Sequence, residues 1–257
     1  MPWLVGVLVL ITFVFTFVMV FIVIERRGIG RFQLRPGPNR VGPMGMLQPV
    51  ADALKVLTKE DIIPARGDKW VHWMAPVIVF VPALLIIAVV PFQEGAILAD
   101  LNIGILYIVA ISSVSVVGVF MAGWGSNNKY SLVAAMRAVA QMVSYEIPLA
   151  LSILGVVLVA GSLSMTKIVE GQSVPFILLQ PLGFLIFFLG SSAELNRTPF
   201  DLLEAESEII AGYHTEYSGM KFALFYLGEY AHALAVSAIV TTLFLGGWKF
   251  PWGIVPS

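Results

Sequence analysis

Long apolar runs alternate with shorter polar segments along this chain, which is the pattern of helices that cross a membrane. The first run, residues 3–24, contains no charged side chain. A helix of that length rises about 33 Å, enough to cross a hydrocarbon core of about 30 Å. Five further runs are found at residues 71–90, 103–123, 136–160, 175–193 and 222–247. Their apolar residues are continuous rather than alternating, which favours a helix bundle over a β-barrel.

The chain is therefore predicted to form one all-α, polytopic transmembrane domain of about six helices over residues 1–257. Pro76 and Pro82 are expected to kink the second helix unless neighbouring helices bond the freed carbonyl groups. The first run does not resemble a signal peptide, because no basic residue precedes it and charged residues follow without a small-residue cleavage site. We expect it to remain as a helix.

Composition agrees with a membrane location. Mean hydropathy is +0.90, and hydrophobic residues make up 58% of the chain against 12% charged. A soluble domain has about 25% charged residues. These values exclude soluble catalytic domains, disordered chains and nucleic-acid binders, and the absence of cysteine excludes disulfides and iron–sulfur ligation by thiolates.

The positions of lysine and arginine predict the orientation. Nine of these residues lie in segment 25–70, and 13 of the 15 lie in alternate segments beginning with that one. Cytoplasmic loops of membrane proteins carry such an excess of basic residues. Segments 25–70 and 194–221 are therefore predicted to be cytoplasmic, with the N-terminus outside, in a bacterial inner membrane or an equivalent energy-transducing membrane.

The first long segment is basic, with nine cations and five carboxylates. Its stretch 35–43 (RPGPNRVGP) is too rich in proline and glycine for a regular helix. Residues 48–59 predict a helix lying in the membrane interface, since Val50, Leu54 and Leu57 share one face. The segment either anchors the chain at the lipid headgroups or frames an opening between the membrane and the cytoplasm.

The second long segment is acidic. Its carboxylates are Glu194, Asp201, Glu204, Glu206, Glu208 and Glu216. Asp201, Glu204 and Glu208 would lie along one stripe of a helix, where like charges repel. Apolar residues lie among these acids, so the segment is predicted to pack on the bundle, where clustered carboxylates share protons. A solvated loop helix is the alternative.

Two acids lie inside predicted spans, Glu146 and Glu229. An ionisable group at membrane depth costs about 2.5–3.5 kcal/mol on insertion scales, so it favours a polar path for protons. A structural hydrogen bond between helices is the alternative. Glu229 and His232 have the spacing of a di-iron ligand pair, but no second such pair exists, and we expect no metal site.

Several motifs together resemble one family. They are ERRGIGRFQLRPGPNRVGP at 25–43, LQPVADALK at 47–55, TKED at 58–61, RAVAQ at 137–141, SYE at 144–146, AELNRTPFDLLEAESE at 193–208, and EY at both 216–217 and 229–230. The chain resembles one membrane subunit of proton-pumping NADH:quinone oxidoreductase (respiratory complex I), the one designated H in bacteria and 1 in mitochondria.

This resemblance implies a subunit at the joint between the membrane and hydrophilic arms. Such a subunit forms much of the tunnel for quinone (ubiquinone or menaquinone), while NADH, FMN and Fe–S clusters belong to partner subunits. The implied partners are the hydrophilic-arm subunits of the quinone site, adjacent small membrane subunits and membrane lipid. By motif match, Arg26 and Arg35 line the quinone passage. The implied proton-relay residues are Glu146, Glu194, Glu204, Glu206, Glu208, Glu216 and Glu229.

The family normally continues through two more membrane helices beyond Gly247, which this sequence is expected to lack. Two other functions remain open. A related membrane-bound hydrogenase would use the chain as its anchor and need no quinone. A stand-alone proton or cation carrier should show inverted repeats with broken helices, and no repeat is found in the sequence.

Overall fold

A computed structural model describes residues 2–201 and 211–249, and every element named within those ranges is a helix. The long helices are α1 (Pro2–Phe32), α3 (Lys69–Val89), α4 (Gly104–Gly125), α5 (Lys129–Ala160) and α10 (Gly219–Phe244). The shorter ones are η1 (Pro43–Gly45), α2 (Gln48–Thr58), α6 (Met165–Gly171), α7 (Phe176–Leu179), α8 (Pro181–Glu194), η2 (Gly212–His214) and η3 (Gly247–Lys249). Five of the described helices are long and apolar enough to cross a membrane, which confirms the predicted all-α, polytopic fold.

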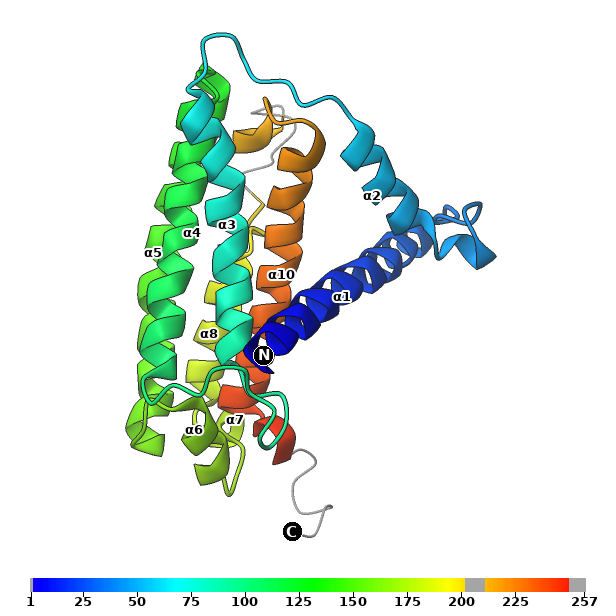
Figure 1. The fold of residues 1–257 in the computed structure, drawn as a ribbon. Helices are drawn as coiled ribbons and strands as arrows, with labels where there is room; N and C mark the ends of the chain where they lie inside the picture. Colours follow the sequence, from blue (N-terminus) through cyan, green and yellow to red (C-terminus); the bar gives the residue numbers. More distant parts are fainter. Residues whose placement is uncertain (1, 202–210, 250–257) are drawn as a thin grey trace.

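Four of the long helices form a bundle. Helices α3, α4, α5 and α10 stand side by side, and α8 packs against α5 (Figure 1). Helix α1 leaves this bundle at an angle and leads to α2 (Figure 1). Only 11% of the apolar window of α1 is buried, against 39% in α3, α4 and α10. Most residues of α1 are therefore exposed or only partly buried in the described chain, although Val14 and Val18 pack into the core.

The helix ends follow from local sequence. Asp68 caps α3, because its Oδ1 accepts hydrogen bonds from the backbone N–H groups of Trp70 and Val71. Asn128 caps α5 in the same way through the N–H of Tyr130. Helix α5 ends at Gly161, whose φ of 66° lies in the left-handed region that glycine adopts without strain.

The helices differ in extent from two of the apolar runs. The run 3–24 lies inside α1, which continues as a helix to Phe32 because charged residues end an apolar run without ending a helix. The run 175–193 is divided between α7 and α8 at Gln180, since Pro181 cannot continue the preceding helix. Gln180 stabilises the break by donating a hydrogen bond to the carbonyl of Gly155.

Helix α3 runs without interruption through Pro76 and Pro82. Both prolines are buried, and α4 approaches closely at Gly118. A Cβ at Gly118 would lie 2.7 Å from Cγ2 of Val79 and 3.0 Å from its backbone nitrogen. The close contact between α3 and α4 therefore requires glycine here.

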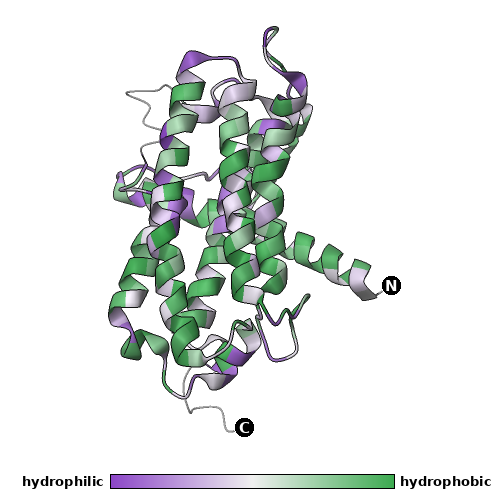
Figure 2. Cartoon of the chain, turned by 90° about the vertical axis from the view of Figure 1, so that its left-hand side faces the viewer, coloured by the Kyte–Doolittle hydropathy of each residue, from purple (hydrophilic) through white to green (hydrophobic). Residues whose placement is uncertain are grey.

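Hydrophobic residues cover the shafts of the helices, and hydrophilic residues gather in the connections at both ends (Figure 2). Inside the bundle, Phe187 of α8 and Phe244 of α10 pack at 5.6 Å between ring centroids. Ile86 and Ile87 of α3 are buried in the same core. This core holds the helices that carry the acidic residues.

The chain's lack of cysteine allows a direct test of its orientation. We expect single cysteines at Gln93 and Ser173 to react with an impermeant thiol reagent added outside intact cells. A cysteine at Asn39 should react only after the cells are opened, because the basic segment is predicted to face the cytoplasm. All three positions are exposed, and the reverse labelling pattern would contradict the orientation.

Candidate functional site

Arg197 connects the first long helix to the last. Its Nη1 lies 2.8 Å from Oε1 of Glu25 on α1, and its Nε lies 3.0 Å from Oε1 of Glu229 on α10. Tyr230 donates a hydrogen bond of 2.6 Å to the other oxygen of Glu25, and its ring lies 4.8 Å from the guanidinium carbon. These four side chains form what we call the Arg197 network.

The connection after α8 places Arg197 at this point. Gln141 of α5 donates hydrogen bonds of 2.9 Å to the carbonyls of Ala193 and Phe200, on either side of Arg197. Asn196 takes a positive φ of 53° in the turn between them, a conformation that asparagine adopts more readily than most residues. The turn therefore aims Arg197 at α1 and α10.

The Arg197 network is partly shielded from water, with Arg197, Glu25 and Glu229 side chains 33%, 23% and 26% exposed. Burial alone would lower the pKa of the guanidinium, but the Glu229 and Glu25 carboxylates outweigh it and raise the pKa above its ordinary value. Arg197 is therefore a fixed positive charge, with the carboxylates of Glu25 and Glu229 as its counter-charges.

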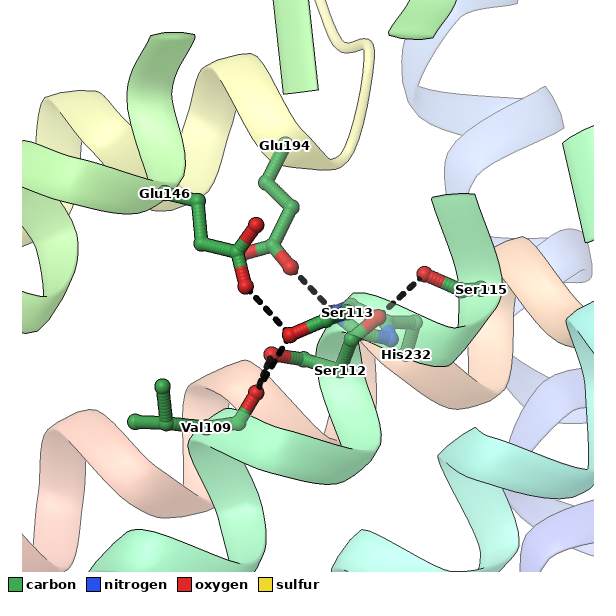
Figure 3. Close-up of polar contacts among 7 residues, drawn as sticks. All are labelled: Val109, Ser112, Ser113, Ser115, Glu146, Glu194 and His232. Carbon is green, nitrogen blue, oxygen red and sulfur yellow. Dashed lines mark hydrogen bonds and ion pairs between the residues drawn. The ribbon is translucent and has the colours of Figure 1, made fainter. Parts of the chain in front are cut away.

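A second acidic pair lies deeper in the bundle (Figure 3). Glu146 of α5 accepts a hydrogen bond of 2.5 Å from the hydroxyl of Ser113 on α4. Glu194 of α8 has its Oε1 at 3.6 Å from Nε2 of His232 on α10. Figure 3 shows both carboxylates reaching from α5 and α8 into the same space. We call these two acids the Glu146–Glu194 pair.

A third polar group lies at the upper end of the bundle in Figure 1, where α3, α5 and α10 begin. Glu216 accepts a hydrogen bond of 2.6 Å from the side-chain amide of Asn128. Lys221, almost fully buried, pairs with Asp61 at 2.9 Å. Tyr217 stacks on His72 with 3.9 Å between ring centroids, and burial raises the pKa of its phenol, which stays neutral.

A basic cavity of about 460 Å³ lies where α1 ends. Its lining residues are Arg26, Ile29, Arg35, Pro36, Gly37, Pro38 and Gln48. Arg26 is held by an ion pair of 2.6 Å with Asp52 of α2, and Arg35 donates a hydrogen bond of 2.7 Å to the side chain of Gln33. The two arginines expected to line a quinone passage thus face one cavity of ligand size.

The structure distributes the expected relay residues over these groups. Glu229 belongs to the Arg197 network, Glu146 and Glu194 form the inner pair, and Glu216 lies at the upper end. Glu204, Glu206 and Glu208 lie outside the described residues.

Sequence reasoning did not assign the partners of these acids. The unassigned partners are Glu25, Arg197, Tyr230, Ser113 and His232. The only signal available was indirect: Glu25 adjoins the basic segment, and Arg197 is the one cation near the acidic run.

Comparison with known proteins agrees with the family resemblance. A sequence model of the NADH dehydrogenase family matches residues 5–256. An NADH-quinone oxidoreductase protein from Dehalococcoides mccartyi, the subunit designated H, is 68% identical over 248 residues, covering 96% of this chain and 70% of that protein. Proteins of the same name from Carboxydothermus hydrogenoformans and Brevibacillus brevis are 51% and 50% identical, over 99% and 96% of this chain and 73% and 74% of their own lengths.

His214 provides a pH-dependent test of the upper end. Burial lowers its pKa to about 4, whereas an unfolded chain protonates histidine near pH 6.5. Between these values the unfolded chain binds a proton that the folded chain excludes, so stability must fall as the pH falls. We expect a loss of up to about 3 kcal/mol.

Thermal unfolding of the protein in detergent, followed from pH 7 to about pH 4, measures this loss. The variant His214→Phe should show a shallower decline, because it has no group to titrate at this position. Equal slopes for the two proteins would contradict the assignment.

Proposed function

The chain belongs to the NADH dehydrogenase family, and we propose that it acts as the membrane subunit of a proton-pumping NADH:quinone oxidoreductase. In this role it forms the passage that admits quinone from the bilayer and holds the first carboxylates of the proton-coupling path. NADH, FMN and the Fe–S clusters would belong to partner subunits. The names of the relatives favour this function over that of a hydrogenase anchor.

One observation carries the proposal: neighbouring residues of α1 belong to the basic cavity and to the Arg197 network. Arg26 lines the basic cavity and pairs with Asp52. Glu25, the residue before it, is bound by Arg197 and Tyr230. A change of charge in the cavity would therefore occur next to Glu25, a carboxylate of the Arg197 network.

The cavity suits the polar end of a quinone. Its volume of about 460 Å³ is in the range of small-molecule sites, about 300–1,000 Å³. Arg26 and Arg35 supply permanently charged donors that hydrogen-bond a carbonyl oxygen and stabilise negative charge that develops on it.

Coupling follows from electrostatics. Negative charge on a quinone raises the proton affinity of nearby carboxylates. A proton taken up at Glu25 weakens its hold on Arg197 and leaves Glu229 as the main counter-charge of the guanidinium. In this way a reaction in the cavity would change the electrostatic surroundings of Glu229 on α10.

The first test is Arg35→Ala. Loss of a fixed charge from the cavity should slow electron transfer to quinone about tenfold, on the scale of one charge-assisted hydrogen bond. NADH oxidation by a water-soluble acceptor should be unchanged. Both rates are measured on the purified complex.

The matched control is Arg40→Ala, since Arg40 is exposed and does not belong to the residues that line the cavity. It should behave as the unmodified protein. Equal loss of both reactions in Arg35→Ala would indicate failed assembly, and full quinone activity would remove Arg35 from the passage.

The second test is Glu229→Gln, which keeps the shape and hydrogen bonding of the side chain but cannot exchange a proton. We expect quinone-linked activity and membrane-potential generation to fall together, about tenfold or more, because a coupled enzyme stalls when its proton path stalls. Both are measured in vesicles containing the assembled complex.

Glu94→Gln is the control for the chemical change itself, because Glu94 is exposed in the connection between α3 and α4. It should retain both activities. If Glu229→Gln also pumps at the full rate, Glu229 is a structural residue and the proposed relay is wrong.

A further inference from the structure

His232 lies between the two acidic groups of the site. Glu229 precedes it by three residues on α10, so both side chains lie on neighbouring positions of one helix face. Glu194 likewise precedes Arg197 by three residues. The chain pairs these residues crosswise: Arg197 with Glu229 at 3.0 Å, and Glu194 with His232 at 3.6 Å.

Because of this crosswise pairing, α10 contacts both acidic groups: Glu229 belongs to the Arg197 network, and His232 contacts the Glu146–Glu194 pair. The side chains of His232 and Glu194 are 12% and 9% exposed, so bulk water has little access to them. Figure 3 shows His232 beside the space that Glu146 and Glu194 enter. A proton moving between the two acidic groups along α10 would meet the imidazole.

The strength of the contact between His232 and Glu194 depends on whether the imidazole is protonated. At 3.6 Å the two atoms are slightly farther apart than in a hydrogen bond. A protonated imidazole at this distance is attracted to the carboxylate as an ion pair, whereas a neutral one is bound weakly. Imidazole is also the side chain that most readily both accepts and donates a proton near neutral pH.

Glu194 of α8 pairs with His232, and Glu146 of α5 reaches into the same space. Glu229 lies one turn back on α10, where it is paired with the cation Arg197. Helix α4 contributes the hydroxyl of Ser113 and contains no charged residue. A proton on His232 therefore has the carboxylate of Glu194 as its nearest acceptor, with Glu146 close by.

We propose that His232 carries protons between the Arg197 network and the Glu146–Glu194 pair. A proton released by Glu229 is taken up by the imidazole one turn along α10. The Nε2–H bond then breaks and an O–H bond forms at Glu194, which returns the imidazole to its neutral state. This inference rests on the proposed function, because it assigns one more carrier to the same proton path.

The test is His232→Asn in the assembled complex. Asparagine can donate a hydrogen bond to Glu194, but its amide does not take up or release a proton near neutral pH. A histidine with only a structural role would therefore be replaced without much loss. We expect quinone-linked activity and membrane-potential generation to fall about tenfold, while NADH oxidation by a water-soluble acceptor persists. Full activity and pumping in this variant would overturn the inference.

The matched control is Ser237→Ala on the same helix, because Ser237 is exposed and its hydroxyl bonds only the carbonyl of Ala233 in the described chain. It should retain every activity. If Glu229→Gln is inactive and His232→Asn is fully active, the carboxylate path stands and His232 is removed from it. If both are fully active, the proposed carboxylate relay itself fails.

A measurement on the unmodified protein covers the case in which His232→Asn does not assemble. Infrared difference spectra of the complex with ¹⁵N-labelled histidine should show imidazole bands that change when quinone is reduced. These bands should be absent from His232→Gln, with the bands of other histidines retained. An unmodified complex without imidazole bands would overturn the inference.

Discussion

The fixed charge of Arg197 is the constraint on which the site depends. A guanidinium cannot lose its proton under these conditions, so a position that is two-thirds shielded from water requires counter-charges close by. Glu25 and Glu229 supply them from helices at opposite ends of the sequence. Alongside the apolar contacts of Val14 and Val18, this ion-pair network therefore fixes where α1 meets α10.

The charges of the same network do not cancel. Two carboxylates share one guanidinium, so the ionised network carries a surplus negative charge in a partly dry location. In the proposed function, one proton taken up by the network would cancel that surplus and still leave Arg197 with a counter-charge. The third group, Tyr230, bonds Glu25 and lies against the guanidinium, which holds the geometry in either state.

Much of the fold could be predicted from sequence, because hydropathy records which segments a bilayer can contain. It does not record where a helix ends outside the apolar layer, so the extension of α1 to Phe32 was missed. Acids at Glu146 and Glu229 could be recognised because charge is rare at membrane depth. Their partners could not, since Arg197 reaches Glu25 across 172 positions and no local pattern encodes such a contact.

Helix α5 holds several parts of the site in place through hydrogen bonds. It carries Glu146, and its Gln141 holds the turn that aims Arg197. Near its start, Ser131 binds the carbonyl of Tyr213 and Asn128 binds Glu216. The described chain on both sides of the acidic run is thus fastened to one helix. A large displacement of either flank would break several of these hydrogen bonds at once, so the coupling proposed above would have to use small side-chain movements.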